Sequence, residues 1–181
     1  PSDLIGDYQE HNKKTVIQTF KILNEQTNFK VGDENIKSGL LHVVKNTGLL
    51  GRWQQLGTNP KVICDTAHNK NGLEIVLKQI QKETFNHLHI VLGVVNDKEL
   101  DEVLPLFPKD ATYYFCKPNI PRGLDANLLH KKALQFSLTG DTYNSVTEAY
   151  NTAQNNSTKN DFIYIGGSTF VVAELPLNKE V

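Results

Sequence analysis

The stretch Lys61-Val-Ile-Cys-Asp-Thr-Ala-His-Asn69 decides both the fold and the place of the site. Residues 61–65 predict a short buried strand that ends on the carboxylate of Asp65, and residues 66–69 form the turn before an amphipathic helix predicted over 72–83. In an open α/β sheet, ligands bind at the carboxyl ends of strands, where helix N-termini present unpaired N–H groups. The polar turn therefore predicts a site for a nucleotide or a carboxylate substrate.

Beyond residue 60 the sequence alternates between apolar runs and helical patterns. Further strands are predicted over 88–95, 112–117, 142–143 and 162–166, and further helices over 98–107, 125–136 and 145–154. The strands are continuous apolar runs, as expected when helices cover both faces of a parallel sheet. These patterns predict an α/β fold, a Rossmann-like, doubly wound and mostly parallel sheet of about five or six strands with flanking helices.

Residues 1–48 have a different character, because they show helical periodicity without a convincing strand. Apolar spacing predicts one helix over 9–24 and a second over 33–46, with Asp33 as N-cap and Gly48 as a typical C-terminal stop. Two helices alone bury little apolar surface. We therefore expect this helical segment to pack on another part of the protein.

The composition is that of a globular protein, with 181 residues, 39% hydrophobic residues and a net charge of −1. This balance argues against a nucleic-acid partner, and no run approaches the roughly 18 apolar residues of a membrane span. Cys64 and Cys116 lie in apolar runs and are predicted to be buried free thiols, which suits a cytoplasmic protein. The chain begins at Pro1 and contains no methionine, from which we expect an excised fragment.

The two standard phosphate-binding loops, G-x-x-x-x-G-K-[ST] and G-x-G-x-x-G, do not occur in the sequence. If this domain contacts a nucleotide, we expect it to do so as an accessory surface, with the phosphate loop elsewhere.

Three polar residues near the first predicted strand are candidates for that contact. Asp65 is placed either to accept hydrogen bonds from ribose hydroxyls or to cap its own turn, and His68 either supports Asp65, contacts a phosphate or is simply exposed. Arg52, in Gly51-Arg52-Trp53-Gln54, is the cation best placed for a phosphate, since a guanidinium binds phosphate oxygens bidentately. Asp-x-x-His has no further partner with metal-ligand spacing, so no metal site is predicted.

Other polar residues follow the later predicted strands. Lys98 is a candidate for an anionic substrate, whereas Ser168, after Gly166-Gly167, is typical of a tight turn and a helix N-cap. If the topology is right, Lys98, Arg122 and Ser168 lie with Asp65 along one edge of the sheet.

In this order along the chain, the motifs resemble the C-terminal part of folylpolyglutamate synthases and bifunctional dihydrofolate synthases, which belong to the Mur ligase superfamily. The family pattern reads G-R-[FW]-[EQ], then D-G-A-H-N-P, then D-K-[DE], and it is similar to Gly51–Gln54, Asp65–Asn69 and Asp97-Lys98. The segment Gly6–Asn12 resembles the family's G-x-[YH]-Q-x-x-N element at the end of the central ATPase domain, and Gly166–Ser168 its closing G-S turn.

The chain also departs from the family pattern. Thr66 replaces the usual glycine and Lys70 the usual proline, so we expect a slightly different turn. The family's phosphate loop, magnesium ligands and carbamylated lysine belong to an N-terminal region that this sequence does not contain.

The resemblance implies an ATP-dependent ligase that joins L-glutamate to a folate or dihydropteroate carboxylate. An acyl phosphate would be the intermediate, ADP and phosphate the products, and Mg²⁺ would be held by the N-terminal region. Arg52 would contact the ATP phosphates and act in catalysis with His68, which would support the nucleotide contact. Asp65 would hold the ribose, and Asn12 with Gln9 would meet the adenine. Lys98 and Ser168 would receive the incoming glutamate.

The resemblance also implies a division of the chain into 1–48 as the helical tail of the ATPase domain, 49–59 as a linker and 60–181 as the glutamate-ligase domain. We expect a monomer whose partner is the ATPase domain of the same polypeptide, and an isolated chain without activity. A cell-wall Mur ligase remains an alternative, although it should show H-N-x-x-N instead of Tyr8-Gln9-x-x-Asn12. A non-catalytic α/β binding domain is the other alternative.

Overall fold

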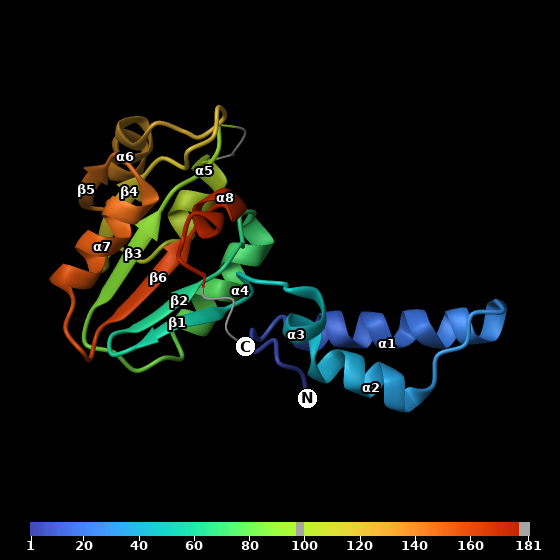
Figure 1. Cartoon of the computed structure of the whole chain (residues 1–181). Coiled ribbons are helices and arrows are strands. Elements are labelled where there is room, and N and C mark those ends of the chain that lie inside the picture. The colour runs from blue at the N-terminus through green and yellow to red at the C-terminus, as the bar shows by residue number, and fades with distance from the viewer. Residues whose placement is uncertain (97–99, 178–181) are drawn as a thin grey trace.

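The computed structural model describes residues 1–96 and 100–177 and shows a helical arm attached to an α/β part (Figure 1). The arm contains α1 (Gln9–Gln26), α2 (Asp33–Leu41) and α3 (Val43–Thr47). The strands are β1 (Gln54–Thr58), β2 (Lys61–Cys64), β3 (Leu88–Leu92), β4 (Thr112–Cys116), β5 (Gly140–Tyr143) and β6 (Phe162–Gly166). The other helices are α4 (Lys70–Ile80), α5 (Leu100–Val103), the 3₁₀ helix η1 (Leu104–Leu106), α6 (Ala126–Leu134), α7 (Val146–Asn156) and α8 (Thr169–Ala173).

The sheet has six strands in the order β1-β2-β6-β3-β4-β5. All neighbouring strands from β2 through β6, β3 and β4 to β5 pair in parallel. At the other edge β1 pairs antiparallel with β2. The predicted doubly wound and mostly parallel sheet is therefore confirmed. The five parallel strands alternate with helices along the chain, so their carboxyl ends meet at one edge, as in other open α/β sheets.

Strand β1 was not predicted, and it lies within 49–59, which we expected to be a linker. Its sequence Gln-Gln-Leu-Gly-Thr has one strongly apolar residue and no clear alternation. The strand forms because its backbone completes the ladder with β2, from the pair Gln54 and Cys64 to the pair Thr58 and Lys61. Tertiary pairing, rather than local pattern, decides the structure here.

Both faces of the sheet are buried, which explains why the strands read as unbroken apolar runs. On one face Ile63 and Ile90 pack with residues of α4, η1 and α6. On the other face Val91 and Ile165 pack with residues of α7 and α8. The thiols Cys64 and Cys116 are free and buried, as predicted.

The helical arm contrasts with this core, because Gln9 is the one buried residue within α1, α2 and α3. The single helix predicted over 33–46 is two helices that break at His42, and Gly32 rather than Asp33 is the N-cap of α2. Gly48 ends α3 in the left-handed conformation expected of a C-terminal stop (φ 65°). Among residues 1–96 and 100–177, no helix is long and apolar enough to cross a membrane.

Truncating the sheet core should destabilise the fold. Ile90 of β3 is 0% exposed, whereas Ile75 of α4 is 39% exposed. We expect Ile90→Ala to lower the free energy of unfolding by about 2–5 kcal/mol, because it leaves a cavity, and Ile75→Ala by less than about 1 kcal/mol. Urea unfolding followed by the fluorescence of the single tryptophan, Trp53, measures both changes. Equal losses for the two variants would contradict this account of the core.

Candidate functional site

Asp65 follows β2 directly and lies at the junction of three segments of the chain. The residue is 1% exposed, and its backbone N–H donates to Ile165 O of β6 (3.1 Å). Oδ1 accepts from the backbone N–H of Ala67 (2.7 Å). Oδ2 accepts from the Tyr8 hydroxyl (2.7 Å) and from the backbone N–H of Trp53 (2.6 Å). The carboxylate therefore caps its own turn and also binds two segments that are distant in the sequence, those of Tyr8 and Trp53.

The same contacts set the electrostatics of this junction. Burial raises the pKa of Asp65 above its usual range, while the bonds from Tyr8, Ala67 and Trp53 act in the opposite direction. Burial, followed by the nearby Asp65 charge, raises the pKa of the Tyr8 hydroxyl. The phenol therefore keeps its proton and serves as a donor to the carboxylate.

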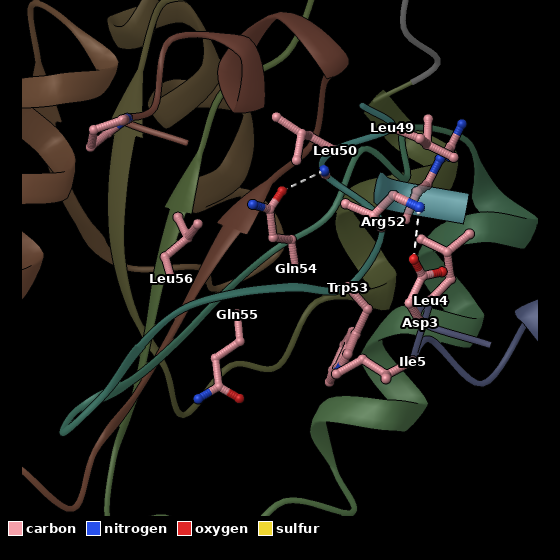
Figure 2. Close-up of a pocket in the computed structure, with 13 residues that line it drawn as sticks. Asp3, Leu4, Ile5, Leu49, Leu50, Arg52, Trp53, Gln54, Gln55 and Leu56 are labelled. Atoms are coloured by element: carbon pink, nitrogen blue, oxygen red, sulfur yellow. Dashed lines mark hydrogen bonds between the residues drawn. The ribbon is translucent and has the colours of Figure 1, made fainter. Parts of the chain in front are cut away.

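The segment Gly51–Gln54 forms a tight turn that presents Arg52 at the surface. Gly51 and Trp53 both have left-handed backbones, with φ of 74° and 51°. Gly51 N–H donates to Gln54 Oε1 (2.8 Å; Figure 2), and Gly51 O accepts from Thr66 N–H (2.9 Å). Trp53 is 2% exposed and packs in the core. The backbones of Gly51 and Trp53 are held by hydrogen bonds, so the backbone position of the exposed Arg52 between them is fixed.

The turn Thr66–Asn69 brings the predicted histidine to the surface beside Asp65. His68 is exposed, and its Nδ1 lies 2.9 Å from Thr66 O. The Asn69 side chain accepts from Gly72 N–H (2.8 Å), so Asn69 is the N-cap of α4. This cap starts α4 at Lys70, two residues before the predicted start.

The start of α1 forms the facing side of the site. Asp7 N–H donates to Gln79 Oε1 of α4 (2.8 Å), and the Asp7 carboxylate pairs with Lys82. These contacts place Gln9 and Asn12 near the strand end, where Asn12 Nδ2 donates to Gln9 Oε1 (3.0 Å).

The three segments enclose a hollow of about 370 Å³ at the carboxyl end of β2. Its lining contains all five residues that the sequence analysis assigned to the nucleotide, together with others: Tyr8, Gln9, Asn12, Leu49, Arg52, Asp65, Thr66, Ala67, His68, Asn69, Gly72 and Ile75. We call it the Asp65 hollow. A second hollow of about 290 Å³ adjoins it and shares Leu49 and Arg52 with it (Figure 2).

Of the two residues expected to receive glutamate, Ser168 is described by the structure and does not reach this hollow. Ser168 is 2% exposed and serves as the N-cap of α8, with Oγ accepting from Phe170 N–H (3.2 Å). Ser168 does not line the Asp65 hollow. Lys98 lies outside the described residues. Arg122, at the same edge of the sheet, holds its guanidinium 5.0 Å from the ring centre of Phe170.

Sequence reasoning missed two features of the site. Tyr8 was quoted only as part of a motif, yet its hydroxyl reaches across 57 residues of sequence to Asp65. The left-handed Trp53 was also missed, since nothing in a local pattern predicts such a backbone for tryptophan. In the two described ranges, no group of three His, Cys, Asp or Glu side chains is arranged to hold a metal ion.

A doubly wound sheet with a polar hollow at a strand's carboxyl end defines an α/β domain of the kind that binds ligands at this edge. Residues 51–169 match the family described as Mur ligase, glutamate ligase domain. The chain belongs to this family.

Related proteins are longer ligases. Over 174 residues the chain is 30% identical to a probable bifunctional folylpolyglutamate synthase/dihydropteroate synthase of Haloferax volcanii, covering 94% of this chain and 20% of that protein. A structure of E. coli FolC in complex with DHPP and ADP has 25% identity and a TM-score of 0.67 over 81% of this chain and 34% of that one. Mycobacterium tuberculosis folylpolyglutamate synthase complexed with ADP and AMPPCP shares the fold, with 23% identity and a TM-score of 0.78 over 95% of this chain and 40% of that one. The chain thus spans about a fifth to two fifths of the length of these relatives.

The Gly51 backbone provides a test of the site's geometry. A Cβ at Gly51 would lie 2.8 Å from Val172 Cγ1 and 2.9 Å from Thr66 Cγ2, at a φ that side chains disfavour. We expect Gly51→Ala to cost about 1–3 kcal/mol of unfolding free energy. Gly39, within α2, has open space around it, so Gly39→Ala should be neutral or stabilising by up to about 1 kcal/mol. Unfolding followed by tryptophan fluorescence and circular dichroism checks both, and a harmless Gly51→Ala would contradict the geometry.

Proposed function

We propose that the chain is the C-terminal part of an ATP-dependent folylpolyglutamate or dihydrofolate synthase. This ligase joins L-glutamate to a folate or dihydropteroate carboxylate through an acyl phosphate and releases ADP and phosphate. Family membership and the names of the curated relatives support the class of reaction.

One observation carries the proposal for this chain's own residues. Gln9, Asn12, Arg52, Asp65 and His68 come from three separate segments, and they line one hollow at the carboxyl end of β2. The two amides suit the adenine, the cation and the imidazole suit the phosphates, and the carboxylate suits the ribose hydroxyls. Random decoration of the surface would not gather them at the ligand-binding edge of the sheet.

Within this proposal the roles follow from the chemistry of each group. The Gln9 and Asn12 amides can donate to and accept from the adenine edge. Arg52 binds phosphate oxygens and stabilises the charge that develops during phosphoryl transfer, and His68 supports that contact. Asp65 lies in the same hollow and is our candidate for the ribose hydroxyls, and Lys98 and Ser168 remain our candidates for the incoming glutamate.

The helical arm supports the proposed division of the chain. Its helices expose apolar side chains that a free-standing segment would bury, with Val16, Ile17 and Ile22 of α1 between 37% and 50% exposed. We propose that residues 1–48 belong to the ATPase domain, that 49–59 connect the domains, and that 60–181 are the glutamate-ligase domain. Since β1 lies within 49–59, the C-terminal half of this connecting segment is also the edge strand of the sheet.

The remaining expectations complete the proposal. Magnesium is the proposed cation of the complete enzyme, held outside this chain, and a related Yersinia pestis enzyme was solved with AMPPNP and Mn ion. We propose a cytoplasmic monomer. The folate assignment is favoured over a cell-wall ligase by the Tyr8-Gln9-x-x-Asn12 element and by the curated relatives, and over a non-catalytic domain by the composition of the Asp65 hollow.

Removing the guanidinium should impair the complete ligase. We expect Arg52→Ala to lower kcat/KM for ATP by roughly 100-fold, because the variant loses contacts to the phosphates of bound ATP and to the charge that develops on them during transfer. Arg52→Lys should restore part of the loss. Lys131→Ala, an exposed cation of α6 outside the hollow, is the matched control and should leave the kinetics unchanged. Steady-state kinetics of Arg52→Ala equal to the parent would remove Arg52 from the site.

The 181-residue chain alone should be inactive, because the resemblance places the phosphate loop and metal ligands elsewhere. We expect no ADP release from ATP with dihydropteroate and glutamate. The complete ligase should release ADP only when both substrates are present. ADP release by the isolated chain would contradict the proposed division of the active site.

A further inference from the structure

The two oxygens of the Asp65 carboxylate carry different numbers of hydrogen bonds. Each carboxylate oxygen has two lone pairs that can accept a bond. Oδ2 accepts from the Tyr8 hydroxyl (2.7 Å) and from the Trp53 N–H (2.6 Å), so both of its acceptor sites are occupied. In the described part of the chain, Oδ1 accepts one hydrogen bond, from Ala67 N–H (2.7 Å). The acceptor site that remains for a ligand is therefore on Oδ1.

The orientation of the carboxylate decides whether a ligand can reach this site. Asp65 lines the Asp65 hollow, but the residue is only 1% exposed, so little of it is open to a ligand. The terminal torsion of an aspartate has broad minima, so the neighbours of the carboxylate, rather than the torsion itself, set its rotation. The bonds from Tyr8 and Trp53 to Oδ2 restrain that rotation and leave one site of Oδ1 for a ligand.

Tyr8 is itself held in place by its neighbours. Next to it, Asp7 N–H donates to Gln79 Oε1 of α4 (2.8 Å), and the Asp7 carboxylate pairs with Lys82 Nζ (2.5 Å). A Cβ at Gly6 would lie 2.8 Å from Cε1 of Tyr8, so the ring packs closely on the backbone of its own segment. The ring also packs against the buried core. The hydroxyl that donates to Oδ2 therefore comes from a ring whose position is fixed.

We infer that Tyr8 is a positioning residue for the ribose, because its bond to Oδ2 orients the Asp65 carboxylate so that Oδ1 accepts one ribose hydroxyl. The inference rests on the proposed function, since it requires a nucleotide in the Asp65 hollow. It goes beyond that function by giving a side chain of residues 1–48 a part in a contact made by the sheet. The segment before α1 and the end of β2 then determine together how the ribose is held.

Kinetics of the complete ligase with deoxynucleotides test the inference. Tyr8→Phe removes only the hydroxyl, and the variant is assayed with ATP, with 2′-deoxy-ATP and with 3′-deoxy-ATP. We expect the KM for ATP to rise roughly tenfold with kcat unchanged, because the ribose is held equally in the ground state and the transition state. With the deoxynucleotide that lacks the hydroxyl bound by Oδ1, the loss should be less than about twofold, because no ribose bond remains to be misdirected.

The matched control is Tyr113→Phe. The Tyr113 hydroxyl also donates a single bond, to Pro108 O (2.5 Å), and Tyr113 does not line the Asp65 hollow. This variant should keep the parent kinetics with all three nucleotides. Equal losses of Tyr8→Phe with all three nucleotides would overturn the inference, because Tyr8 would then support the fold of the site and not the ribose contact. A parent KM for ATP in Tyr8→Phe would overturn it as well.

Calorimetric titration with ADP, 2′-deoxy-ADP and 3′-deoxy-ADP makes the same comparison without turnover. Tyr8→Phe should bind ADP roughly tenfold more weakly than the parent and bind one of the two deoxynucleotides as tightly as the parent does. Equal weakening with all three ligands in an active ligase would refute the inference alone. A parent protein without glutamate-dependent ADP release would refute the proposed function, while the titration would still decide whether Tyr8 positions the ribose contact.

Discussion

The structure of the site depends on one carboxylate that accepts hydrogen bonds from three segments of the chain. Asp65 receives the N–H groups of Ala67 and Trp53 and the hydroxyl of Tyr8. Buried polar groups of this kind must be fully satisfied, because an unpaired one costs more than a satisfied one gains. The requirement fixes the turn after β2, the loop around Arg52 and the start of α1 relative to one another.

Much of the fold could be predicted because its information is local. Continuous apolar runs marked β3, β4 and β6, and Ser145 marked the start of α7, where it accepts from Glu148 N–H. Strand β1 could not be predicted, since it depends on pairing with β2. The break at His42 could not be predicted either, since it depends on Asp3, whose carboxylate caps the N–H groups of Val43 and Val44.

The candidate site, like the fold, could be predicted in part. The motifs around Arg52, Asp65 and Gln9 predicted one common location, and the structure brings them to one hollow. What the motifs could not predict is how the residues are held, because the bond from Tyr8 to Asp65 spans 57 positions and the left-handed Trp53 depends on that same acceptor. Local sequence identifies the chemistry of a site better than it identifies the contacts that position it.

The central claim is that the Asp65 hollow receives ATP, with its adenine at the start of α1. Photolabelling of the complete ligase with 8-azido-ATP, followed by tryptic mapping, tests it most directly. The account predicts that the label falls on the peptide that ends at Lys13, which contains Gln9 and Asn12, and that excess ATP prevents it. A label that is blocked by ATP but falls only on peptides remote from the hollow would contradict the claim.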